Sequence, residues 1–302
     1  MARSYGNRGG TRRNPRFSYH IESIFRHQLL AELVDECDCV FHLAAAVGVR
    51  LVVDSPVRTL NTNVRATELL LQIASKKKRK VIIASSSEVY GKSNKFPFSE
   101  DDDLVLGPTL RARWSYGCSK AVSEFLAFGY HRERGLPIVI TRLFNTVGPR
   151  QTGAYGMVVP RFVQQALSGQ PITVYADGKQ ARCFTWVGDV VAALHGLMNL
   201  PSAVGRVFNI GSDQETTILE LAKLVKQITG SLSPINFVTY EKAYGDGFED
   251  MVRRVPDLAR IREAIGYTST KTLEEIIAAI TESAPEFSLN PVGHALVVGM
   301  DV

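Results

Sequence analysis

The sequence predicts an α/β fold built on a parallel, doubly wound sheet. Short apolar runs at residues 39–45, 81–84 and 137–143 have the continuous hydrophobic character of strands buried on both faces. Amphipathic segments at residues 56–75 and 116–134 separate these runs and have the apolar spacing of helices. This order gives two consecutive strand–helix–strand units, which place their strands side by side and parallel.

Later segments continue the alternation. Further helices are predicted at residues 158–168, 189–199, 217–229 and 272–283, and a further strand at residues 206–210. The polar, proline-containing stretch 91–113 lies between a predicted strand and a predicted helix, where α/β proteins carry loops over a ligand site. We therefore expect the functional residues at the carboxyl ends of the strands.

The positive charge of the chain is concentrated at its N-terminus. The formal net charge is +5, and residues 1–30 contain six arginines and one acidic residue, so this segment accounts for the whole surplus. We interpret residues 1–16 as a basic, disordered arm and not as a binding face. This interpretation argues against a nucleic-acid partner.

Composition also bears on the cellular setting. No segment offers the ~18 consecutive apolar residues that a membrane span needs, and the start lacks the apolar core of a signal peptide. The spacing of the four cysteines fits neither a disulfide framework nor a zinc site; they are Cys37, Cys39, Cys118 and Cys183. We therefore expect a reduced, cytoplasmic protein without a membrane segment or a metal.

Tyr116 and Lys120 form the most informative pair in the chain. One helical turn separates them, so both side chains project from the same face of the predicted helix. A free phenol titrates near ~10, and Lys120 is placed to lower the pKa of Tyr116 so that the phenol can act as a general base. Ser86 follows the strand 81–84 and would lie at its carboxyl end, within reach of a substrate hydroxyl and Tyr116.

Six sequence blocks together resemble one enzyme family. They lie at residues 42–45, 61–64, 86–91, 116–120, 142–150 and 173–182. Their content and order are similar to the extended short-chain dehydrogenase/reductase family, in the branch of NAD-dependent nucleotide-sugar epimerases, dehydratases and decarboxylases. The resemblance runs from about residue 29 to residue 283.

The resemblance implies a Rossmann-like doubly wound parallel sheet with a smaller C-terminal substrate-binding lobe. The NAD-binding domain would cover residues 17–150, with 187–215 returning to it, and the lobe would cover mainly 151–283, followed by a loose tail at 284–302. The resemblance also implies NAD as the cofactor, a UDP-sugar as the substrate, and a homodimer formed through the helix that carries Tyr116.

The resemblance assigns roles to individual residues. The implied catalytic residues are Tyr116, Lys120, Ser86 and Glu88, and the implied NAD-binding residues are Ala44, Asn63, Tyr116 and Lys120. The implied substrate-binding residues are Ser87, Asn145, Val159, Tyr175, Arg182 and Arg254. Arginine suits a diphosphate site because its planar guanidinium pairs with phosphate oxygens through two hydrogen bonds.

The glycine-rich turn of the family is missing from the sequence. Family members begin with a strand, a Gly-x-x-Gly-x-x-Gly turn and a helix that together hold the pyrophosphate of NAD. Here Gly6, Gly9 and Gly10 lie among arginines and asparagines with no apolar strand before them. Residues 17–30 resemble the third strand of the family and the turn after it, so we expect an N-terminally truncated fold. A non-catalytic protein that binds a nucleotide sugar is therefore an alternative to an enzyme.

The resemblance implies that Tyr116 takes the proton of the sugar O4 while the C4 hydride passes to NAD. Hydride return to the other face would give 4-epimerisation, and a C6 carboxylate would allow loss of carbon dioxide. Dehydratase relatives have an Asp-Glu pair where this chain has Ser87 and Glu88, and Ser87 cannot act as their acid. Glu88 favours a UDP-glucuronate decarboxylase, whereas segments 42–48 and 145–156 are more similar to UDP-glucose-type 4-epimerases. We expect a UDP-hexose or UDP-hexuronate 4-epimerase, with the decarboxylase as the alternative.

Overall fold

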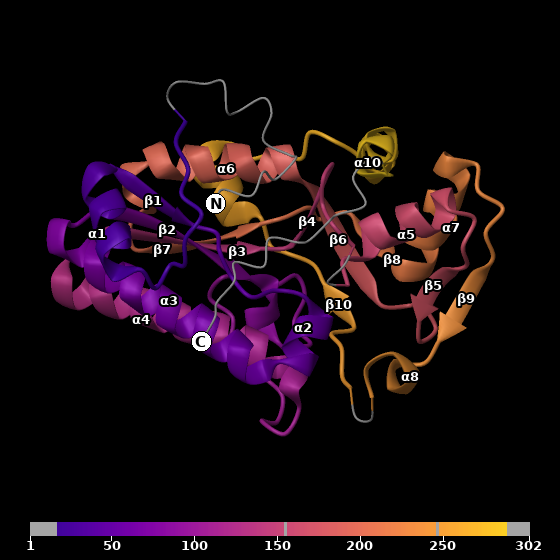
Figure 1. Ribbon diagram of the computed structural model, residues 1–302, viewed down its shortest axis with the longest axis horizontal. Coiled ribbons are helices and arrows are strands. Elements are labelled where there is room, and N and C mark those ends of the chain that lie inside the picture. The colour runs from indigo at the N-terminus through magenta and orange to yellow at the C-terminus, as the bar shows by residue number, and fades with distance from the viewer. Residues whose placement is uncertain (1–16, 154–155, 246–247, 289–302) are drawn as a thin grey trace.

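The computed structural model describes residues 17–153, 156–245 and 248–288. Its main sheet has four parallel strands in the order β1-β2-β3-β7 (Figure 1). They are β1 (Cys39–His42), β2 (Lys80–Ser86), β3 (Ile138–Leu143) and β7 (Arg206–Ile210). The parallel, doubly wound α/β sheet predicted from the sequence is confirmed.

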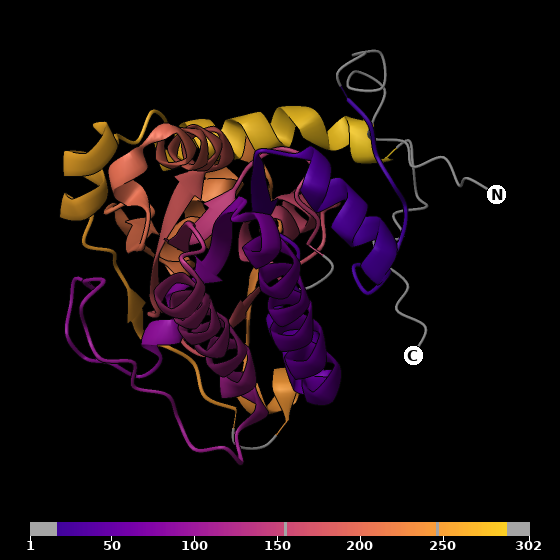
Figure 2. The same ribbon diagram turned by 90° about the vertical axis from the view of Figure 1, so that its left-hand side faces the viewer.

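Helices cover both faces of this sheet. On one face lie α1 (His27–Glu36), α3 (Pro56–Lys77) and α4 (Ser115–Arg134), and on the other lie α6 (Val187–Asn199) and α9 (Ala259–Ile265). Figure 2 shows α3 and α4 running side by side beneath the sheet. Because successive strand side chains point to opposite faces, Val81 and Ile83 pack with the first set of helices and Ile82 packs with the second.

The later part of the chain forms a smaller lobe beside the main sheet (Figure 1). Its strands are β4 (Asn145–Val147), β6 (Ala181–Trp186) and β10 (Arg253–Arg254), with β8 (Glu215–Thr217) antiparallel to β6, and the separate pair β5 (Ile172–Tyr175) and β9 (Ile235–Val238). Its helices are α5 (Val158–Leu167), α7 (Ile218–Thr229), α8 (Tyr240–Tyr244) and α10 (Leu273–Ser288). Buried residues of α5, α7 and α10 form one apolar cluster with β5 and β6.

Local sequence signals explain where the helices of the lobe begin and end. The Thr217 hydroxyl accepts a hydrogen bond from the backbone N–H of Glu220, and the Glu220 carboxylate accepts one from the backbone N–H of Thr217. This reciprocal capping satisfies two N–H groups that have no partner inside α7. The helix ends at Gly230, whose φ of 62° is a left-handed conformation that favours glycine.

The predicted strand within residues 17–30 is wrong. Residues 17–26 contain no strand, and α1 begins at His27. Phe17, Tyr19 and Ile21 alternate as in a strand, yet a strand needs a neighbour for its backbone groups, and among the described residues β1 pairs only with β2.

Two other boundaries differ from the expectation. The first strand ends at His42 and not at residue 45, because the backbone of Ala46 bonds to the Asn63 side chain instead of to a strand. The helix α10 continues to Ser288, past the predicted start of a loose tail at residue 284. The predicted arm at 1–16 and the remainder of the predicted tail lie outside the described residues.

The described residues offer neither a membrane-crossing helix nor a cluster of metal-binding side chains. None of the helices there combines the length and the apolar character that crossing a bilayer requires. The same residues contain no group of three or more His, Cys, Asp or Glu side chains arranged to hold a metal ion.

Candidate active site

A cavity of about 360 Å³ lies at the carboxyl ends of β2 and β3, between the main sheet and the lobe. This is the place where parallel α/β sheets bind ligands. Ten of the predicted site residues line it: Ser86, Ser87, Glu88, Tyr116, Lys120, Asn145, Val159, Tyr175, Arg182 and Arg254. Ala44 and Asn63 are not among the lining residues.

The end of β2 places Ser86 and Glu88. Residues 81–85 of this strand are buried, and the chain then turns into the short 3₁₀ helix η3 (Ser87–Tyr90). The Ser86 hydroxyl accepts a hydrogen bond from the backbone N–H of Glu88 at 3.2 Å and so caps the turn. The sequence of a buried strand followed by serines therefore fixes both side chains at the cavity.

The first two turns of α4 place Tyr116 and Lys120. The helix follows the 3₁₀ turn η4 (Ala112–Trp114), and both side chains are buried. Gly117 allows the helix to touch the preceding turn, since a Cβ at this position would lie 2.6 Å from the Glu88 carbonyl oxygen. The Lys120 ammonium donates to the Ala84 carbonyl at 2.7 Å, which ties α4 to β2.

The predicted lowering of the Tyr116 pKa by Lys120 is wrong for this structure. Burial raises the pKa of Tyr116, and the Glu88 carboxylate raises it further. The Ser86 hydroxyl, hydrogen-bonded to the phenol, partly opposes the rise. Lys120, whose ammonium lies 6.0 Å from the centre of the Tyr116 ring, is not among the main causes of the shift. Tyr116 is therefore a neutral phenol at neutral pH and needs a further positive charge to become a base.

Lys120 and His42 titrate below their ordinary ranges. Burial lowers the pKa of Lys120 to about 8, which the Glu124 carboxylate partly opposes. Burial and the charge of Lys120 lower the pKa of His42 to about 4. His42 is thus neutral, and its Nε2 shares a hydrogen bond of 3.0 Å with the Thr67 hydroxyl, which suits a structural role.

Two arginines hold Glu88. Arg113 donates to both of its carboxylate oxygens, at 2.5 and 2.9 Å, and Arg254 donates to Oε1 at 2.7 Å. All three residues are buried. Burial alone would raise the pKa of Glu88, but the charges of Arg113 and Arg254 outweigh it and lower the pKa to about 2. Glu88 is therefore ionised, and both of its carboxylate oxygens are paired with arginines.

Asp250 extends this network into the lobe. Its carboxylate accepts from Arg182 at 2.9 Å, from Arg113 at 3.4 Å and from the Tyr240 hydroxyl at 3.3 Å. Arg254 lies beside Glu88, and its positive charge acts on the Tyr116 phenol. Its predicted contact with the diphosphate stays a prediction.

Aromatic side chains also line the cavity. Tyr244 and Phe248 stack with ring centres 4.3 Å apart, and Tyr175 meets Tyr244 edge to face at 5.3 Å. The Arg161 guanidinium lies 4.4 Å from the centre of the Tyr175 ring. Flat aromatic faces and a stacked guanidinium suit a nucleobase.

The residues present fit one half of NAD. Tyr116 and Lys120 fit the nicotinamide ribose, because the buried Lys120 ammonium has three N–H groups and the Ala84 carbonyl takes only one. The Asn63 side chain accepts a hydrogen bond from the Ala46 backbone N–H and donates one to the Ser119 hydroxyl. The predicted contacts of Asn63 and Ala44 with NAD stay predictions. In the described part of the chain, no glycine-rich turn leads from a strand into a helix to hold the pyrophosphate.

Sequence reasoning missed several lining residues. They are Arg113, Arg161, Tyr240, Tyr244, Phe248 and Asp250. Arg113 lies three positions before Tyr116, and Asp250 lies four positions before Arg254, so proximity to predicted residues was the available signal. Neither belongs to the sequence blocks that carried the resemblance.

Comparisons with known proteins agree with this geometry. The family model described as GDP-mannose 4,6 dehydratase matches residues 5–280. The chain belongs to this family. The predicted resemblance to NAD-dependent nucleotide-sugar epimerases, dehydratases and decarboxylases is thereby confirmed, and with it membership of a family of enzymes.

Two relatives with similar sequences carry decarboxylase names. The chain is 46% identical to a UDP-N-acetyl-alpha-D-glucosaminuronate decarboxylase of Bacillus cytotoxicus over 80% of this chain and 74% of that protein. It is 34% identical to UDP-glucuronic acid decarboxylase 1 of Xenopus tropicalis, over 83% of this chain and 58% of the frog protein. The chain thus spans little more than half the length of the frog relative.

Solved structures with the same fold carry epimerase names. UDP-glucuronic acid 4-epimerase of Bacillus cereus, in complex with UDP-glucuronic acid and NAD, superposes with a TM-score of 0.84 at 28% identity, covering 93% of this chain and 86% of that one. UDP-glucose 4-epimerase of Thermotoga maritima with UDP-glucose gives a TM-score of 0.81 at 28% identity, covering 91% and 86%. The Rossmann-like fold is confirmed.

Proposed function

We propose that this chain oxidises C4 of a UDP-hexuronate with NAD as its cofactor, and that 4-epimerisation is the outcome. The observation that carries the proposal is the meeting of Ser86, Tyr116 and Lys120 in one cavity at the carboxyl end of β2. The enzyme names of the relatives argue against the non-catalytic alternative.

A uronate fits the relatives and the cavity better than a neutral hexose. The 46% identical relative and the Bacillus cereus neighbour have names that specify sugars with a C6 carboxylate. In this chain, the Nε of Arg254 is buried and has no hydrogen-bond partner, and Arg254 lines the cavity beside Glu88. A substrate carboxylate would accept a stronger, charge-assisted hydrogen bond from this group than a C6 hydroxyl would.

Side chains of this chain transfer the proton of the sugar O4. Tyr116 takes the proton from O4, and Ser86, already hydrogen-bonded to the phenol, bridges the two oxygens. Bound NAD would supply the hydride acceptor for C4 and a positive charge. Lys120 holds the end of β2 through Ala84 and offers its remaining N–H groups to the ribose. For the nucleotide, Arg182 and Asn145 suit the diphosphate, and the aromatic side chains of Tyr175, Tyr244 and Phe248 suit uracil.

Decarboxylation is the second candidate outcome, and two observations favour it. The relative that is 46% identical is named a decarboxylase. Glu88, which the sequence analysis associated with decarboxylases, lies within the Arg113 and Arg254 network beside Tyr116. Once C4 is a ketone, a C6 carboxylate belongs to a β-keto acid and can leave as carbon dioxide.

One product analysis separates these outcomes. The purified chain is incubated with NAD and UDP-glucuronate, UDP-N-acetylglucosaminuronate or UDP-glucose, and products are resolved by chromatography and NMR. UDP-galacturonate or its N-acetyl analogue supports 4-epimerisation, and a UDP-pentose with carbon dioxide supports decarboxylation. Conversion of UDP-glucose alone would contradict the uronate. No product from any of the three would restore the non-catalytic alternative.

A homodimer through α3 and α4 is also part of the proposal. Val57 and Leu60 on α3 and Val122 and Phe125 on α4 are apolar and exposed, with Phe125 73% exposed. Apolar residues at helical spacing on two adjacent helices suit a four-helix interface between two copies. Analytical ultracentrifugation should give a dimer for the wild type and a monomer for Phe125→Glu; a monomeric wild type would contradict this part.

The cytoplasmic location and the lack of a nucleic-acid partner stay predictions.

A further inference from the structure

Arg113 contacts carboxylates from both sides of the cavity. Its two Nη atoms hold both oxygens of Glu88 at 2.5 and 2.9 Å, and Nη2 also lies 3.4 Å from Asp250. Glu88 belongs to the turn after β2, whereas Asp250 lies in the lobe just before β10. The Arg113 side chain is only 3% exposed, so these contacts are shielded from water and salt.

Both oxygens of Glu88 are occupied by cations. Oε1 is shared between Arg113 and Arg254, and Oε2 is held by Arg113. A carboxylate in this setting stays ionised, in line with its pKa of about 2, and has no proton to donate near neutral pH. Glu88 therefore serves as the anchor of an ion-pair network and not as an acid.

Arg113 is tied to the reacting groups through short stretches of chain. It lies in η4, three residues before Tyr116, and Glu88 lies two residues after Ser86. The α4 backbone meets the Glu88 turn at Gly117, where a Cβ would come within 2.6 Å of the Glu88 carbonyl oxygen. The Arg113–Glu88 pair therefore joins the segment that carries Tyr116 to the segment that carries Ser86.

We propose that Arg113 is a positioning residue. Its bidentate interaction with Glu88 and its contact with Asp250 set the spacing between Ser86, Tyr116 and the lobe. For its catalytic consequences this inference rests on the proposed function. A displacement of about 1 Å in such a group can lower the rate about 100-fold without loss of substrate affinity. Lysine keeps the charge of Arg113 but cannot form two parallel hydrogen bonds to a carboxylate.

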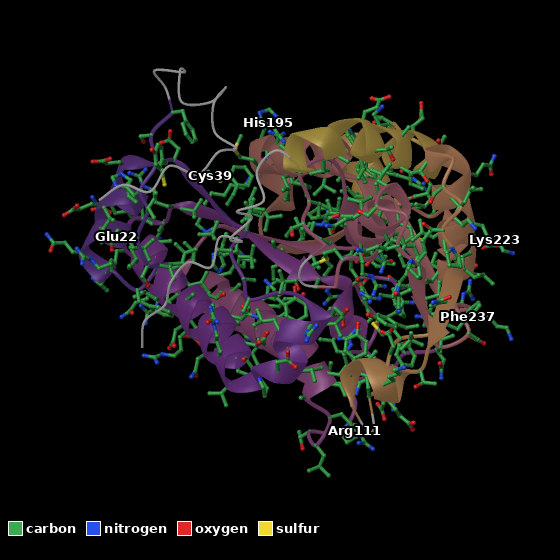
Figure 3. All side chains as sticks on the ribbon, turned by 45° about the vertical axis from the view of Figure 1, so that its right-hand side comes forward. Glu22, Cys39, Arg111, His195, Lys223 and Phe237 are labelled. Atoms are coloured by element: carbon green, nitrogen blue, oxygen red, sulfur yellow. The ribbon has the colours of Figure 1, made fainter. Side chains whose placement is uncertain are left out.

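The test compares Arg113→Lys and Arg113→Met with Arg111→Met. Arg111 is an exposed arginine in the same loop, labelled in Figure 3 at the outer edge of the molecule, and provides the matched control. Hydrogen–deuterium exchange of the peptide covering residues 112–120 should be at least about fivefold faster in both Arg113 variants and unchanged in Arg111→Met, because the start of α4 loses its anchor. Unchanged exchange in both Arg113 variants would overturn the proposal.

Kinetics supply the second readout. Arg113→Lys should lower kcat about 10- to 100-fold with KM within about threefold, since orientation and not binding is lost. If Arg113 acts through Glu88, the double variant Arg113→Met/Glu88→Gln should lose no more activity than the more damaged single variant. If the activity losses of the two single variants multiply in the double variant, the inference is overturned. A wild-type kcat in Arg113→Lys would also overturn it. A wild type that converts no UDP-sugar would refute the proposed function alone, because the exchange measurement still tests Arg113.

Discussion

Replacing Glu88 by glutamine should remove a pH-dependent part of the stability of the fold. The pKa of Glu88 falls from its ordinary 4.5 to about 2 because Arg113 and Arg254 outweigh the cost of burial, which corresponds to about 3 kcal/mol of stabilisation at neutral pH. Since the folded-state pKa is depressed, this stabilisation is complete well above pH 4.5 and is lost as the pH falls towards 2. About 2 kcal/mol of it should be gone at pH 3.

Urea unfolding of the wild type and Glu88→Gln at pH 7 and at pH 3 measures this difference. The variant should be less stable by about 3 kcal/mol at pH 7, and the gap should narrow to about 1 kcal/mol at pH 3. Glu215→Gln is the matched control, because Glu215 pairs with Arg253 through two hydrogen bonds of 2.7 and 2.8 Å at the exposed surface. The Glu215→Gln substitution should lower the free energy of unfolding by less than about 1 kcal/mol at either pH. A gap between wild type and Glu88→Gln that is independent of pH would refute the ionised, buried state of Glu88.

Three further predictions concern the catalytic segment. Tyr116→Phe should slow the C4 oxidation step about 10²- to 10⁴-fold in single-turnover assays of NADH absorbance, and a rate near that of the wild type would exclude Tyr116 as the base. The kcat/KM of the wild type should fall with a midpoint near pH 8 as the Lys120 ammonium loses its proton, whereas a profile flat to pH 9.5 would mean that its charge is not required. Gly117→Ala should destabilise the fold by about 1–3 kcal/mol in urea unfolding and lower kcat, because the new Cβ would meet the Glu88 carbonyl at 2.6 Å; full retention of both would contradict the close approach of α4 to that turn.

Strong local patterns made the sheet and the catalytic pair predictable from the sequence. The strand β2 is a continuous apolar run bounded by a basic segment and serines, and α4 has its tyrosine and lysine one turn apart. Ser86, Tyr116 and Lys120 therefore came together as expected. The strand expected within 17–30 from the family resemblance did not form, because resemblance of a segment is a local signal, whereas strand pairing depends on a neighbour elsewhere in the chain.

The arginine and carboxylate contacts could not be predicted for a similar reason. Arg113 and Asp250 are 137 positions apart, and nothing in the local sequence of either indicates the other. The motif also could not predict that the pKa of Tyr116 is raised. Spacing indicated that Lys120 is near, but burial and the Glu88 charge decide the outcome, and both depend on packing.

The buried Glu88–Arg254 contact acts as a non-covalent cross-link between the main sheet and the lobe. Rigid rotation of one part away from the other would expose an unpaired carboxylate and guanidinium at the same moment, a cost of several kcal/mol. Ligand exchange should therefore proceed by displacement of rim segments such as α8, which contributes no buried residue, while the base of the cavity keeps its shape. Small-angle scattering that shows the same radius of gyration with and without UDP would agree with this behaviour, and a large compaction on binding would contradict it.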